Sequence, residues 1–112
     1  MFSAAFIFEP GVYDADFHQL NDEIEAFAHS IDGFLGVDRW KSSTDERHSS
    51  IYYWKTREAL QIFASHPRHI EAKKNYQRWY KGFHIVISEV LRTYGDSNIQ
   101  HITPNQRKTK TE

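Results

Sequence analysis

The order in which strand-like and helix-like segments follow one another is the feature that most limits the fold of this chain. Residues 2–9 form a short apolar run rich in Phe, as expected of a buried strand. Residues 48–55 are rich in Ile, Tyr and Trp, which favour strands, and residues 83–94 alternate in the pattern of a strand. A further strand is predicted around Leu35, Val37 and Trp40, followed by a polar turn. Four strands are therefore expected.

A first helix is predicted between the first two strands. Asp14 or Asp16 can cap it, because an aspartate oxygen satisfies the free N–H groups of a first helical turn. The helix carries one apolar stripe, formed by Phe17, Leu20, Ile24, Phe27 and Ile31. Asp32 and Gly33 should end it.

A second helical segment is predicted over residues 57–80, after the third strand. Thr56 is the expected N-cap. Pro67 is tolerated only in a first helical turn, so a break is expected at His66-Pro67, with a second helical piece beginning there. Gly82 is expected to end the segment.

The resulting β-α-β-β-α-β order predicts an α+β, ferredoxin-like fold, with an antiparallel four-stranded sheet and both helices on one face. The strands offer apolar or aromatic residues to both faces, for example Phe6 beside Ile7 and Tyr53 beside Trp54. No remaining segment is long enough to cover the second face. A second copy of the chain is the expected cover, which gives a face-to-face homodimer.

Length and composition exclude several classes of protein. The 112 residues suffice for one domain, predicted over 1–94, and residues 95–112 read as a flexible polar tail. The chain has no Cys, which excludes disulfides, thiolate metal ligands and a thiol nucleophile. A net charge of −1 argues against nucleic acid as a partner. With neither a signal peptide nor a membrane-spanning run, a cytoplasmic protein without a membrane partner is expected.

Charge is divided unevenly along the chain. Residues 1–38 contain eight acids and no Lys or Arg, whereas the remainder carries 14 Lys and Arg against seven acids. Two interpretations are open. The oppositely charged surfaces can attract each other within the fold or across a dimer, or the basic region can collect an anionic ligand.

The second helical segment contains the most informative candidate site. Helical spacing places a histidine, a small residue and three rings on one face: His69, Ala72, Tyr76, Trp79 and Tyr80. The rings can be core, with His69 as a packed histidine, or they can line a pocket between helix and sheet in which His69 titrates near neutral pH. His66 and His69 are three residues apart, but Pro67 interrupts the helix between them, and no metal site is predicted.

Four segments occur in an order that resembles the antibiotic biosynthesis monooxygenase (ABM) family. They are SIYYWK at residues 50–55, EAL at 58–60, HPRHIEA at 66–72 and WYKGF at 79–83, preceded by GFLG at 33–36. The resemblance covers about residues 2–94 and implies a dimeric α+β barrel. Some members of this family oxidise polyketide anthrones with O2 and without a metal or organic cofactor, and others bind or degrade haem.

This resemblance suggests a monooxygenase-like protein that oxidises a small aromatic or quinol-like compound with O2 and no cofactor. In this hypothesis His69 is the catalytic base or a donor that stabilises the substrate anion. The substrate-binding walls are Trp54, Phe63, Tyr76, Trp79 and Tyr80. Either Arg68 or Arg78 holds a carboxylate of the substrate.

Two other functions stay open. The alternative from another class is a non-catalytic dimeric module that binds a small ligand. Haem binding or degradation is a third possibility. The haem-degrading relatives use an asparagine, a tryptophan and a histidine where this sequence has approximately Phe6, Phe63 and Lys73, so haem oxygenation is not favoured.

Overall fold

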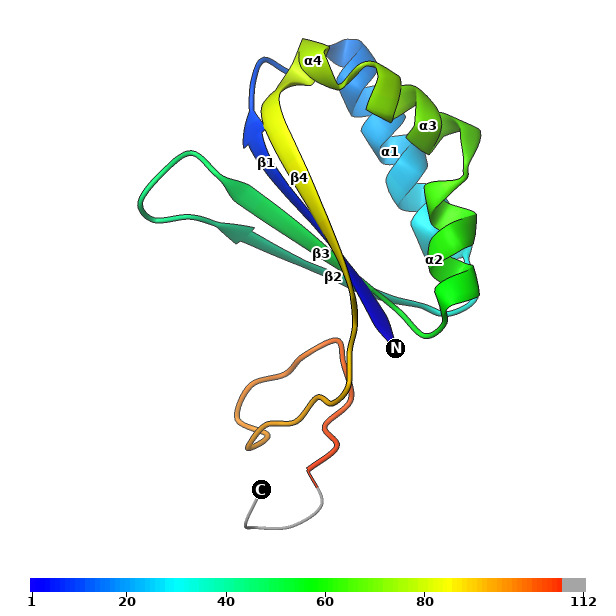
Figure 1. The fold of residues 1–112 in the computed structure, drawn as a ribbon, viewed down its shortest axis with the longest axis vertical. Coiled ribbons are helices and arrows are strands. Elements are labelled where there is room, and N and C mark those ends of the chain that lie inside the picture. The colour runs from blue at the N-terminus through cyan, green and yellow to red at the C-terminus, as the bar shows by residue number, and fades with distance from the viewer. Residues whose placement is uncertain (108–112) are drawn as a thin grey trace.

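Strands and helices follow one another in the computed structural model in the predicted order, with the second helical segment divided into three. The structure describes residues 1–107. The elements are β1 (Phe2–Pro10), α1 (Ala15–Ser30), β2 (Phe34–Lys41), β3 (His48–Trp54), α2 (Arg57–Ala64), α3 (Pro67–Lys74), α4 (Tyr76–Trp79) and β4 (Tyr80–Glu89). The helices cover one face of the sheet (Figure 1). The predicted α+β, ferredoxin-like fold is confirmed.

The sheet has the order β2-β3-β1-β4, and every neighbouring pair is antiparallel. Directly paired residues point to the same face. Phe2 and Ala4 pack against the hydrophobic core under the helices, so the even-numbered residues of β1 define the inner face. The odd-numbered residues, such as Ala5 and Ile7, define the outer face.

Local capping explains where the helices begin. Asp14 is the N-cap of α1 and accepts a hydrogen bond from the Phe17 amide at 2.9 Å. Thr56 caps α2 in the same way through the Ala59 amide, at 3.1 Å. The predicted break at His66-Pro67 is present, and the His66 side chain becomes the cap of α3, with Pro67 in its first turn.

The end of the second helical segment differs from the prediction. The last helix stops at Trp79, and Gly82 lies inside β4, where it pairs with Glu9. Tyr80 already pairs with Pro10, because antiparallel pairing with β1 takes up the backbone groups of this stretch. A distant strand therefore ends the helix, and the local glycine does not.

The hydrophobic core lies at one end of the inner face, between α1, α2 and β3. Its buried residues are Ala28, Ile31, Trp54, Ala59, Leu60 and Phe63. Phe2, Phe34 and Tyr52 pack against it from the sheet. At the other end the helices stand over aromatic side chains of β1 and β4.

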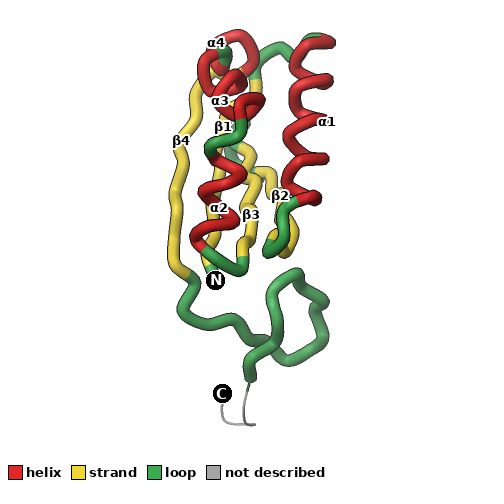
Figure 2. The backbone as a smooth tube through the Cα atoms, turned by 90° about the vertical axis from the view of Figure 1, so that its right-hand side faces the viewer, coloured by secondary structure: helices red, strands yellow, loops and turns green. Residues whose placement is uncertain are grey.

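The chain after β4 returns to the far edge of the sheet. The Gln106 amide donates a hydrogen bond to the Thr93 carbonyl at 2.9 Å. This bond closes a loop that lies below the sheet (Figure 2). From this loop His101 Nε2 bonds to Asp38 of β2 at 2.5 Å, and Thr103 is buried. Within the expected flexible tail, His101 and Ile102 thus contact the outer face of the sheet. Residues 108–112 lie outside the described residues, and flexibility of the segment stays a prediction.

Within residues 1–107, no helix is long and apolar enough to cross a membrane.

Candidate functional site

The inner side of β4 is open. By register Phe83, Ile85 and Ile87 face the helices, yet their exposed fractions are 42%, 40% and 61%. Helix α3 packs against α1 and α2, and none of its residues is buried. We call Phe83, Ile85 and Ile87 the inner face of β4. Three exposed apolar side chains under a helix form a surface on which a flat apolar compound can lie.

His69 of α3 lies on the sheet side of the helices, beside the core. Its ring centroid is 4.7 Å from that of Phe63, whose ring contacts Trp54 and Tyr52. Its Nδ1 lies 3.2 Å from the Phe63 carbonyl oxygen. A carbonyl only accepts, so we assign the proton to Nδ1 and the lone pair to Nε2.

Burial lowers the pKa of His69, although the hydrogen bond to the Phe63 carbonyl partly opposes this effect. The imidazole is therefore neutral at pH 7. Within the described part of the chain, no hydrogen bond is formed by Nε2. A neutral imidazole with a free Nε2 can accept a proton from a bound compound.

Two of the predicted wall residues are core residues. Trp54 is fully buried, and its ring lies 5.0 Å from Phe63 and 4.9 Å from Phe34. These rings fill the space under α2. Among residues 1–107, Trp54 Nε1 is the one buried side-chain nitrogen or oxygen without a hydrogen-bond partner. A buried donor of this kind costs stability unless a bound molecule accepts a hydrogen bond from it.

The other three predicted wall residues lie at the opposite end of the inner face. The Tyr80 ring packs at 5.3 Å from Phe6 and 5.1 Å from Phe8, and its burial raises the pKa of its hydroxyl. The Tyr76 ring meets Phe83 edge to face at 4.9 Å. Trp79 and Tyr80 also border a cavity of about 40 Å³ next to Ala72, which is too small for an aromatic substrate.

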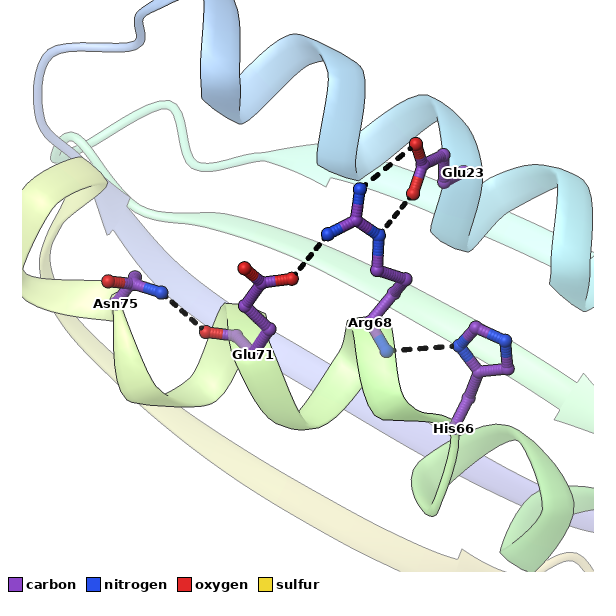
Figure 3. A network of polar contacts seen from close by, with 5 residues as sticks. All are labelled: Glu23, His66, Arg68, Glu71 and Asn75. Carbon is purple, nitrogen blue, oxygen red and sulfur yellow. Dashed lines mark hydrogen bonds and ion pairs between the residues drawn. The ribbon is translucent and has the colours of Figure 1, made fainter.

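The two predicted arginines are held in ion pairs between the helices. Arg68 bonds to Glu23 of α1 through Nε and Nη2, and to Glu71 through Nη1 at 2.5 Å (Figure 3). Arg78 Nη2 lies 3.0 Å from Asp14 and 3.2 Å from Asp16. These carboxylates raise the pKa of both guanidinium groups.

Arg68 and Arg78 also border a polar groove of about 250 Å³ between α1 and α3. This groove lies away from the inner face of β4. The structure therefore does not bring the two arginines together with His69.

A polar cluster on the inner face was not predicted from the sequence. Arg39 of β2 bonds to Glu25 of α1 at 2.8 Å and to the hydroxyl of Ser50 at 3.1 Å, and the Tyr52 hydroxyl donates to the same Glu25. Burial and this carboxylate raise the pKa of Tyr52. One signal could have been used, because Arg39 follows Val37 by two residues, and strand alternation places its charge on the same face as this apolar side chain.

The sequence profile described as "Monooxygenase af470-like" matches residues 11–94, which is three quarters of the chain. The chain belongs to this family. No curated protein matches this sequence significantly.

Several solved structures share the fold of this chain. Rv0793 from Mycobacterium tuberculosis has a TM-score of 0.67 at 14% identity, over 84% of this chain and 98% of its own. SnoaB from Streptomyces nogalater, a cofactor-independent oxygenase, has a TM-score of 0.63 at 13% identity, over 82% and 94%. A candidate antibiotic biosynthesis monooxygenase from Deinococcus radiodurans has 0.68 at 14%, over 85% and 97%. The predicted resemblance to ABM proteins is confirmed.

Within the described residues, no three His, Asp or Glu side chains are placed to hold a metal ion together. Polar groups that border the inner face include the cluster of Glu25, Arg39, Ser50 and Tyr52 and the imidazole of His69.

Proposed function

We propose that this chain oxidises a small aromatic or quinol-like compound with O2 and without a cofactor. One observation carries the proposal: His69 is a half-buried, neutral imidazole whose Nδ1 bonds to the Phe63 carbonyl, and whose Nε2 has no hydrogen-bond partner among residues 1–107. The open inner face of β4 provides an apolar surface for the compound, and the Tyr76 ring borders it at Phe83.

O2 has a triplet ground state and reacts slowly with closed-shell organic molecules, unless the molecule is an electron-rich anion that gives up one electron. Nε2 of His69 first takes a proton from the reacting CH2 or O–H group of the substrate. For a CH2 group, the carbanion transfers one electron to O2, and the radical and superoxide combine to a C–O bond. The peroxide takes the proton back from His69. Loss of water then leaves a carbonyl group, so CH2 and O2 become C=O and H2O.

The experiment that tests this proposal is oxygen consumption with a panel of anthrones, naphthols and quinols. We expect His69→Gln to lower turnover by about 10²-fold, the size of a typical general-base contribution. The exposed His29→Gln is the matched control and should keep wild-type turnover. Turnover that is unchanged in His69→Gln overturns the role of His69. Tight binding of panel compounds without oxygen consumption by the wild-type chain would identify a ligand-binding module instead.

A homodimer is the second part of the proposal. The outer face carries the apolar side chains of Ala5, Ile7, Ile51 and Val86 on three adjacent strands. Val86 is 42% exposed in the single chain. Packing the same face of a second copy against this surface buries it, as in other sheet-on-sheet interfaces.

A further inference from the structure

Side chains of the inner face change from apolar at the β4 edge of the sheet to cationic at the β2 edge. Ile85, Phe6, Ser50 and Arg39 are direct neighbours across β4, β1, β3 and β2. At about 4.8 Å per strand this row spans about 14 Å. It begins with apolar side chains, continues with a hydroxyl and ends with a guanidinium group.

The adjacent row repeats this change. Phe83, Phe8, His48 and Lys41 are paired across the same four strands. The Phe8 and His48 rings are stacked at 5.3 Å. Two parallel rows therefore place cationic groups at the β2 edge of the inner face and apolar groups at the β4 edge.

Arg39 is held in place but not enclosed. Its Nη2 bonds to Glu25 at 2.8 Å and its Nη1 to Ser50 at 3.1 Å, which fixes the plane of the guanidinium group. Its side chain is 54% exposed. A guanidinium group has five N–H donors, so two such bonds leave donors for a ligand.

The local charge distinguishes Arg39 from the two arginines predicted from the sequence. Arg68 faces two carboxylates, those of Glu23 and Glu71, and this group has a net charge of −1. Arg78 likewise faces Asp14 and Asp16.

Arg39, by contrast, faces one carboxylate, that of Glu25, and the register places exposed Lys41 in the next row of the same face. The Arg39 group is neutral, and Lys41 adds a positive charge. Of the three places, this one attracts an anion most strongly.

We propose that Arg39 and Lys41 bind the carboxylate of a flat aromatic substrate whose ring system lies over Phe6 and the inner face of β4. This inference rests on the proposed function, since it names the class of compound that the same site takes. The carboxylate stands at the end of the molecule remote from the β4 edge. The arrangement matches an elongated, amphipathic compound of two or three fused rings.

Binding of 2-naphthoate and its neutral analogue 2-naphthamide, measured by isothermal titration calorimetry, tests the inference. The wild-type chain should bind the naphthoate about tenfold more tightly, as expected of hydrogen bonds to a charged group. Arg39→Gln should remove this preference, and Arg78→Gln should keep it. Lys41 is exposed, so Lys41→Gln leaves the fold intact and should reduce the preference by about threefold. Circular dichroism confirms that each variant is folded.

A preference that persists in both Arg39→Gln and Lys41→Gln overturns the inference, and so does a preference that disappears in Arg78→Gln alone. Should Arg39→Gln not fold, the Lys41→Gln result decides. Neither measurement depends on turnover. If Arg39→Gln loses the preference but the wild-type chain consumes no oxygen, the proposed oxidation is contradicted and this site is not. If the wild-type chain consumes oxygen and Arg39→Gln keeps the preference, this site alone is contradicted.

Discussion

At the scale of single residues, His69 links stability to pH. Burial lowers its pKa in the folded chain, whereas the unfolded chain has the ordinary value of about 6.5. As pH falls below about 6.5, the unfolded state binds a proton that the folded state does not, so the free energy of unfolding decreases. The free energy of unfolding, measured with urea at neutral and at mildly acidic pH, should therefore decrease less on acidification for His69→Gln than for the wild type. Equal losses in both proteins would contradict this prediction.

Gly36 is a second residue whose substitution should lower stability. Its φ is +142°, and a Cβ there would lie 2.8 Å from Ile102 Cγ2. Gly36→Ala should lower the free energy of unfolding by about 1–3 kcal/mol, through strain and overpacking. Adding Ile102→Ala should recover part of this loss, because it opens the space. If thermal denaturation shows fully additive effects, residues 95–107 do not rest on β2 in solution and the predicted flexible tail is correct.

At the scale of elements, Asp14 joins the start of α1 to α4. One oxygen caps α1 and accepts from Trp79 Nε1 at 3.0 Å, and the other meets Arg78. Asp14→Ala should lower the Tm by about 5 °C. Asp14→Asn keeps a capping oxygen and loses the ion pair, so its Tm should lie between those of the wild type and Asp14→Ala. A Tm of Asp14→Asn equal to that of Asp14→Ala would show that the ion pair, and not the cap, holds the two helices.

The acidic N-terminal third of the chain is explained at the same scale. Glu23, Glu25 and the Asp14–Asp16 pair bond respectively to Arg68, Arg39 and Arg78. The charge pattern left two interpretations open. The first, attraction between oppositely charged groups within the fold, is what the ion pairs of Arg68 and Arg78 show. The second interpretation is kept in the proposal for Arg39 and Lys41, since Arg39 pairs with one carboxylate and Lys41 lies in the next row of the same face.

At the scale of the whole molecule, the two faces of β4 separate the homodimer from the ligand surface. Val86 points to the outer face and its neighbour Ile87 to the inner face, and both are exposed in the single chain. Val86→Glu places a charge in the proposed interface, so light scattering should give the 13.3 kDa of one chain. Ile87→Glu is the matched control and should keep twice that mass. A monomeric wild type, or a dimeric Val86→Glu, contradicts the proposed interface.

Much of the fold followed from local signals. The caps at Asp14 and Thr56 and the break at His66-Pro67 depend on groups within a few residues of each other, and each is found where it was predicted. The boundary at Gly82 was wrong, because the partner strand that pairs with Tyr80 lies some 70 residues away in the sequence. The candidate site was predicted less well for the same reason. Trp54 and Phe63 belong to the core, and Arg68 and Arg78 have partners on α1 that no spacing rule brings to them.

The sequence by itself determined the order of the elements and the starts of the helices, since periodicity and capping act over one or two turns of the chain. Only the tertiary structure decided which arginine lies on the inner face with a single carboxylate partner. Arg39 meets Ser50 through strand register and Glu25 through the packing of α1, and contacts of this kind depend on three segments coming together in space. Their energies are not encoded in any one segment, so they become visible only once the sheet and its helices are assembled.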